Sequence, residues 1–156
     1  LRSAAHRTDK EENSMVQQIS VFIQNEPGKL ALLTGALAKG GIDIRALSIA
    51  DTTDFGILRM LVNNAALAKN ILEKQHYAVG ITPVTVVAVP DVPGGLAKVL
   101  TLLAEGGIDI EYMYSLIGRG EDKAYMVFRI SDEPKLIKLL SAHGISAVTQ
   151  EELGIR

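Results

Sequence analysis

Hydrophobic residues follow two alternating patterns along the chain. The segments 19–24 and 84–89 are short runs rich in β-branched residues, which is typical of strands. Each run is followed, after a short turn, by apolar residues at every third or fourth position, which form one stripe on a helix. The residues of these stripes are Leu30, Leu33 and Leu37 in the first case and Leu96, Val99 or Leu100, and Leu103 in the second. The pattern predicts a strand followed by a helix, twice.

The two strand-helix segments are copies of one another. Residues 27–44 recur as residues 93–110, 66 positions further on and without a gap. Shared composition explains matches of Leu and Ala. It does not explain Pro-Gly at one end and Gly-Gly-Ile-Asp-Ile at the other end in the same register. We interpret the match as a duplication, which indicates two small domains.

The rest of each copy completes the same order of elements. After the paired glycines, which end the first helix, each copy has a second strand, a third strand, a second helix and a closing strand. These are predicted at 42–50, 55–62, 65–75 and 77–81, and at 108–117, 124–130, 133–142 and 145–149. The predicted fold class is α+β: two tandem ferredoxin-like βαββαβ domains, each a four-stranded antiparallel sheet with two helices on one face.

The domain boundaries follow from the repeat. Residues 1–14 are polar and mixed in charge, and we interpret them as a leader or an expression remnant. The first domain is predicted over 15–82 and the second over 83–156, with almost no linker at Thr82-Pro83. Polar loops at 51–54 and 118–122 are expected to connect the second and third strands as hairpins.

Composition removes several classes of function. Hydrophobic residues make up 47% and charged residues 22%, as in folded globular proteins. A net charge of -2 and an aromatic content of 4% argue against nucleic acid and anionic membranes as partners. No apolar stretch reaches the roughly 20 residues of a membrane span. The absence of cysteine excludes disulfides and thiolate chemistry and is simplest in a reducing compartment, so a cytoplasmic location is expected.

Catalytic chemistry has little support in the sequence. None of the three histidines has neighbours that form a triad or a metal-ligand pattern, and no paired carboxylates stand out. The glycine pairs lack the spacing of phosphate-binding loops. We therefore predict no catalytic residue, no metal site and no cofactor, and expect a protein that is not an enzyme.

The two strand-to-helix turns carry the best candidate chemistry. The first amides of a helix have no internal partners and carry the positive end of the helix dipole, so they suit a carboxylate. Gly28 and the pair Gly94-Gly95 remove side chains there, and Asn25 and Asp91 could accept hydrogen bonds from an ammonium group. Together these groups match a zwitterionic amino acid. The alternative remains open that Asn25 and Asp91 are N-caps and that each turn only starts a helix.

The motifs resemble those of the ACT domain family: a strand ending in Asn/Asp-x-Pro-Gly, a helix with Leu-Ala, and Gly-Gly-Ile-Asp-Ile before the second strand. The resemblance covers about residues 17–153. It implies a regulatory fold that binds amino acids at interfaces between domains, often in dimers, with no catalytic role. The implied partners are a free amino acid, a second copy of the chain and a metabolic enzyme. The candidate ligand-binding residues are Asn25, Gly28, Lys29, Leu30, Asp91, Gly94, Gly95 and Leu96.

Other functions compete with the amino-acid sensor. The first is a structural or oligomerisation module of an amino-acid metabolic enzyme, which would bind no ligand. A homodimer or higher homo-oligomer is expected in either case, because open sheet faces leave Phe22 and Ile57 poorly covered. An acylphosphatase-like enzyme would need a glycine-rich anion loop followed by arginine, which neither first strand carries. RNA binding would need aromatic residues on the central strands, where Phe22 stands alone.

Overall fold

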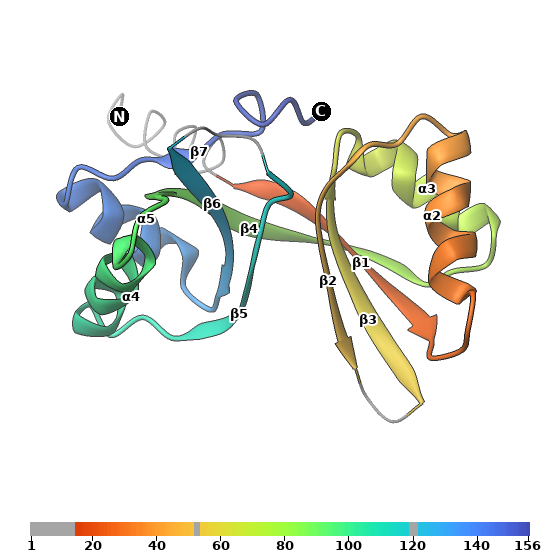
Figure 1. The fold of residues 1–156 in the computed structure, drawn as a ribbon, viewed down its shortest axis with the longest axis horizontal. Helices are drawn as coiled ribbons and strands as arrows, with labels where there is room; N and C mark the ends of the chain where they lie inside the picture. Colours follow the sequence, from red (N-terminus) through yellow and green to blue (C-terminus); the bar gives the residue numbers. More distant parts are fainter. Residues whose placement is uncertain (1–14, 52–53, 119–121) are drawn as a thin grey trace, which may run out of the picture. The chain divides into compact units, whose positions relative to one another are not determined.

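A computed structural model describes residues 15–51, 54–118 and 122–156 of the chain (Figure 1). These residues form two compact units. The first unit contains residues 17–82 and 154–156, and the second contains residues 83–153 together with Met15 and Val16. The predicted leader, residues 1–14, and the middle of both predicted hairpin loops lie outside the described residues.

The first unit is built on an antiparallel sheet. Strand β3 lies between β1 and β2 and pairs antiparallel with both. Strand β4 comes next to β1 in the strand order, and the Phe22 backbone amide donates a hydrogen bond to the Ala78 carbonyl oxygen, 3.3 Å away. The elements are β1 (Val16–Gln24), α2 (Lys29–Lys39), β2 (Ile44–Asp51), β3 (Phe55–Val62), α3 (Ala65–Lys74) and the start of β4 (Val79–Pro90).

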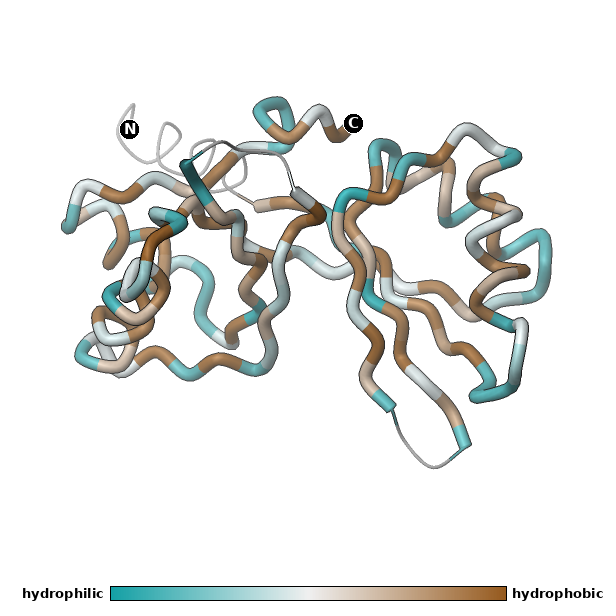
Figure 2. The backbone as a smooth tube through the Cα atoms, in the orientation of Figure 1, coloured by the Kyte–Doolittle hydropathy of each residue, from teal (hydrophilic) through white to brown (hydrophobic). Residues whose placement is uncertain are grey.

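Alternation along the strands creates the core of the first unit. Every second residue of β1 and β3 points toward the two helices, which lie on one face of the sheet (Figure 1). Hydrophobic residues lie along these strands, whereas the turn between β1 and α2 is hydrophilic (Figure 2). Burying each large aliphatic side chain contributes roughly 1.5–3 kcal/mol. The fully buried residues include Ile19, Val21, Leu33, Leu37, Leu58, Met60 and Leu72.

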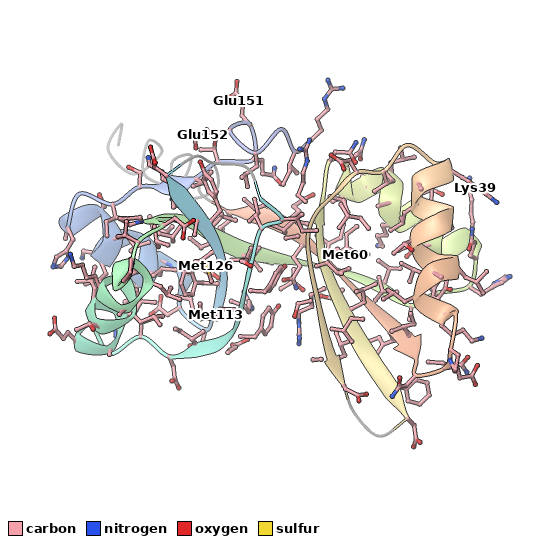
Figure 3. The ribbon with its side chains drawn as sticks, in the orientation of Figure 1. Lys39, Met60, Met113, Met126, Glu151 and Glu152 are labelled. Carbon is pink, nitrogen blue, oxygen red and sulfur yellow. The ribbon has the colours of Figure 1, made fainter. Side chains whose placement is uncertain are left out.

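The second unit repeats this architecture. Strand β6 pairs antiparallel with β4 and β5, and the short β7 pairs antiparallel with β4. Helices α4 and α5 supply the apolar side chains that close the core, and Met113 and Met126 pack against its edge (Figure 3). The elements are β4, α4 (Gly95–Glu105), β5 (Ile110–Ser115), β6 (Lys123–Ile130), α5 (Glu133–Ala142) and β7 (Ala147–Val148).

The α+β class and the alternation of strands and helices on antiparallel sheets are confirmed, but two predicted strand boundaries are wrong. Two strands were expected at 77–81 and 84–89, and the structure has one strand, β4, of 12 residues. A residue before proline favours extended backbone, so Thr82-Pro83 prolongs the strand. The predicted strand 145–149 shrinks to two residues. It ends because Thr149 and Glu152 exchange hydrogen bonds as in a capping box, which turns the chain.

The described helices contain 10 or 11 residues. None of them has the length and hydropathy of a membrane-spanning helix.

Candidate functional site

The two strand-to-helix turns have nearly the same backbone. Gly28 is the N-cap of α2 with φ 84°, and Gly94 is the N-cap of α4 with φ 86°. Both values lie in the left-handed region, which glycine enters without steric cost. In neither helix does a capping side chain accept a hydrogen bond from a backbone amide. The duplicated Pro-Gly sequence therefore produces a duplicated conformation.

Backbone amides at the start of α2 are available to a ligand. The Lys29 amide donates to the Glu26 carbonyl oxygen at 3.3 Å. The amides of Gly28, Leu30 and Ala31 have no acceptor among the described residues. Ala31 is exposed, so these donors lie near the surface. They form the kind of site that binds an anion at a helix N-terminus.

The start of α4 offers the same set of donors. The Gly95 amide donates to the Val92 carbonyl oxygen at 3.0 Å. The amides of Gly94, Leu96 and Ala97 find no acceptor within the part of the chain that the structure describes. Both repeats thus present unpaired donors where a carboxylate was predicted to bind.

Asn25 and Asp91 are exposed residues that do not cap the helices. The Asn25 amide nitrogen donates to a carboxylate oxygen of Asp51 at 3.2 Å, which leaves its side-chain oxygen as an acceptor. The Asp91 backbone amide donates to the Asp122 carbonyl oxygen at 3.1 Å. The alternative interpretation of both residues as N-caps is wrong, because the left-handed glycines occupy that position.

The remaining predicted site residues have different surroundings. Gly95 is buried, and a Cβ atom there would lie 2.0 Å from the Pro90 carbonyl oxygen, so its lack of a side chain lets α4 approach β4. The side chains of Leu30 and Leu96 pack against the cores, so only their backbone amides could meet a ligand. Lys29 is half-buried, and its ammonium group lies 3.5 Å from a carboxylate oxygen of Glu26.

A pocket of about 430 Å³ adjoins the first turn. Lys29 lines it together with residues that sequence reasoning did not assign to a site. Gln75 and His76 come from the end of α3, and His76 has φ 67°. A histidine at a helix end where the second repeat has glycine is the signal that could have indicated this pocket. Its lining residues are Phe22, Gln24, Lys29, Gln75, His76, Tyr77 and Ala78.

The second unit has a pocket of similar size and different chemistry. It measures about 410 Å³ and is lined by Lys123, Tyr125, Gly144 and Glu152, among others. No residue of the turn 91–96 lines it. The two pockets lie at corresponding places, with Phe22 and His76 in the first and Ala88 and Gly144 in the second, but only the first reaches its turn.

A buried carboxyl lies in the second unit, at the first residue of α5. Glu133 is 6% exposed, and one of its oxygens accepts a hydrogen bond from the Thr85 hydroxyl. An Arg129 guanidinium nitrogen lies 3.8 Å from the other oxygen. Burial raises the pKa of Glu133, and the hydrogen bond from Thr85 opposes this rise. Among the described residues, no group of three or more His, Cys, Asp or Glu could hold a metal ion.

Comparisons with known proteins give a family model and several solved structures. The model of the ACT domain pair matches residues 14–155. The crystal structure of protein BT0572 from Bacteroides thetaiotaomicron is 39% identical, has a TM-score of 0.83 and aligns over 90% of this chain and 96% of its own. No curated protein matches the sequence.

Two aspartate kinase regulatory subunits share the fold at lower identity. The ligand-free subunit from Thermus thermophilus is 18% identical, with a TM-score of 0.60 over 83% of this chain and 94% of its own. The subunit from Thermus flavus is 17% identical, with a TM-score of 0.55 over 81% of this chain and 90% of its own. At these identities the likeness shows the fold alone.

Proposed function

Because this chain belongs to the family of ACT domain pairs, we propose that it is a regulatory protein that binds a free amino acid at its strand-to-helix turns. The observation that carries the proposal is the set of unpaired amides at Leu30 and Ala31, repeated at Leu96 and Ala97. These donors would hold the α-carboxylate of the ligand at the positive end of each helix dipole.

An acceptor for the ammonium group lies on the same turns. The side-chain oxygen of Asn25 and the carboxylate of Asp91 follow β1 and β4 directly, before Gly28 and Gly94. An ammonium group would therefore gain a neutral acceptor at the first turn and a charged one at the second. This arrangement supports binding of a zwitterion at both turns.

We take residues 15–82 and 83–156 as the two ACT-like domains and propose a four-stranded sheet in each. The first residues of β4 would complete the first sheet beside β1, and β7 would complete the second. The aspartate kinase regulatory subunits from Thermus thermophilus and Thermus flavus are similar to this chain in fold. Because these proteins are regulatory subunits of an enzyme, they support a metabolic enzyme as the partner that this chain regulates.

The experiment is isothermal titration calorimetry of the full chain with each free amino acid. Ala31→Pro and Ala97→Pro each remove one unpaired amide at an exposed position of a first helical turn, where the change breaks no hydrogen bond within the helix. We expect one amino acid to bind and at least one of these variants to lose tenfold or more in affinity. Ala66→Pro, at the exposed start of α3, is the matched control and should bind as the wild type does.

The competing function is a module that assembles an enzyme without any ligand. It predicts a folded chain that gives no heat with any amino acid. That result, with circular dichroism showing native structure, would overturn the sensor.

A further inference from the structure

We propose that the pocket beside the first turn holds the side chain of the bound amino acid and selects an acidic one, aspartate or glutamate. The inference rests on the proposed function, since the turn would hold the α-carboxylate. The pocket lies within the first unit and measures about 430 Å³. That volume falls in the range of about 300–1,000 Å³ that is usual for small-molecule sites.

The chemistry of the lining is that of an anion receptor. Lys29 contributes an ammonium group, Gln24 and Gln75 contribute amide donors, and His76 contributes an imidazole. No carboxylate lines the pocket. A side-chain carboxylate would find one full positive charge and several donors there, whereas an ammonium group would meet repulsion from Lys29.

The ion pair of Lys29 leaves this lysine able to serve a ligand. Its ammonium group lies 3.5 Å from Glu26, and the two side chains are 35% and 59% exposed. Exposed pairs of this kind are weak because water and salt screen them. A ligand carboxylate could therefore take over the contact at little cost.

The backbone at His76 is a second, independent observation. Among the described residues, His76 is the only one other than glycine with positive φ, at 67°. The corresponding helix end of the second unit has Gly144 with φ 70°. Both residues are followed by an amide that bonds back to a helix leucine, Tyr77 to Leu72 and Ile145 to Leu140. The first unit thus has an imidazole in its pocket where the second unit has no side chain.

Lys29 joins the pocket to the turn. It is the first residue of α2, directly before the unpaired Leu30 and Ala31 amides, and it also lines the pocket. An α-carboxylate on the amides and a side chain in the pocket would therefore be neighbours. The second pocket lacks this continuity, and there a carboxylate, Glu152, accompanies Lys123. We therefore assign the selectivity to the first repeat.

The experiment is calorimetry of the full chain with aspartate, glutamate, asparagine, glutamine, lysine and leucine. We expect an acidic amino acid to bind at least tenfold more tightly than its amide. Lys29→Met should abolish the preference by lowering the affinity for the acid at least tenfold, to about that for the amide. His76→Asn, which keeps a residue that tolerates positive φ, should reduce the preference severalfold. Lys123→Met, in the second pocket, is the matched control and should change neither affinity.

Each other outcome counts against the inference. Tighter binding of lysine or leucine, or an acid preference that survives Lys29→Met, would overturn the assignment of the pocket as the selective site. The proposed function would still stand. A preference lost through Lys123→Met and kept in Lys29→Met would place the selective site in the second unit. If no amino acid binds the folded wild-type chain, the inference and the proposed function both fail.

Discussion

Glycine at two helical positions has opposite consequences for stability. At Gly95 an added Cβ would lie 2.0 Å from the Pro90 carbonyl oxygen, and backbone cannot swing aside as a side chain can. At Gly35, inside α2, nothing lies within 4 Å of an added Cβ. We expect Gly95→Ala to cost about 1–3 kcal/mol through overpacking. Gly35→Ala should gain about 0.5–1 kcal/mol from helix propensity.

Thermal unfolding measures both changes. For a chain of this size, 1 kcal/mol shifts the midpoint by about 2–4 °C. The midpoint should fall in Gly95→Ala and rise in Gly35→Ala. Equal shifts in the two variants would show that α4 does not approach β4 as closely as the structure has it.

The buried carboxyl of Glu133 makes stability depend on pH. Its pKa is raised above the ordinary 4.5, chiefly because burial disfavours the charged form. The folded state therefore holds the proton more tightly than the unfolded state does. The contribution of Glu133 to stability is complete below pH 4.5 and is lost as the pH rises through the raised pKa.

Glu133→Gln removes this titration. From about pH 4 to about pH 8, the free energy of unfolding of the wild type should fall relative to that of the variant, measured by urea denaturation at each pH. Glu151→Gln, on an exposed residue near the C-terminus (Figure 3), is the control and should follow the wild-type curve. A constant difference between the wild type and Glu133→Gln would contradict the raised pKa.

Individual residues show where sequence reasoning stopped. Gly28 and Gly94 could be assigned to the turns, because Pro-Gly before an apolar stripe has few conformations. The role of Asn25 could not be predicted, because asparagine both caps helices and bonds to distant groups. Here its amide nitrogen donates a hydrogen bond to Asp51. His76 stands where the second repeat has glycine, but the pocket around it could not be predicted, since Gln24 and Lys29 lie far away along the chain.

At the scale of elements, the four described helices start in two different ways. Helices α3 and α5 have true side-chain caps: Asn64 and Asp132 each accept a hydrogen bond from a backbone amide three residues on, at 3.0 Å. Helix α2 starts at Gly28, and α4 starts at Gly94 in the same way. We expect Asn64→Ala and Asp132→Ala each to cost about 1 kcal/mol, because an amide of the first helical turn loses its acceptor.

Asn25→Ala and Asp91→Ala are the matched comparison. Neither side chain caps a helix, so each change should cost less than about 0.5 kcal/mol in the free energy of unfolding, measured in urea. A cost near that of Asn64→Ala would show that these residues support the helix starts after all. A loss of amino-acid affinity without a loss of stability is expected at whichever turn binds.

Strand ends were harder to predict than helices. The helix α5 lies at 133–142 as predicted, because its apolar spacing and its capping residue Asp132 agree. Strand β4 was predicted as two strands, because proline usually ends a strand. Whether a proline ends a strand depends on whether a neighbouring strand needs a hydrogen bond from that position. This is decided by the assembled sheet and not by the local sequence.

At the scale of the whole molecule, the duplication predicted most of the architecture. Two copies of one segment must form the same elements, so the order βαββαβ followed without any knowledge of contacts. The difference between the copies was not visible in that way. Part of it lies inside the motif, where Lys29 of the first copy corresponds to Gly95 of the second, and part lies outside it, where the first unit has His76 and the second has Gly144.

The sheet face of the first unit that lies opposite its helices predicts self-association of the chain. Phe22 is 56% exposed, and it pairs in register with the half-buried Ile57 on the face opposite the helices. A large apolar side chain in the middle of a sheet face is more readily buried by a second copy than one on an isolated helix surface. We expect a homodimer or larger species in sedimentation equilibrium, with a dissociation constant that rises at least tenfold in Phe22→Ser.

Leu32→Ser is the matched control for that experiment. Leu32 is 68% exposed on α2, so the substitution removes a comparable apolar side chain from the helix layer. Because both residues are exposed in the single chain, neither change should cost more than about 0.5 kcal/mol of folding stability. Association that weakens in Phe22→Ser and persists in Leu32→Ser would locate the contact on the sheet. Equal weakening in both variants would show that association depends on exposed apolar surface in general and not on the sheet face. A monomeric wild type would contradict the predicted self-association.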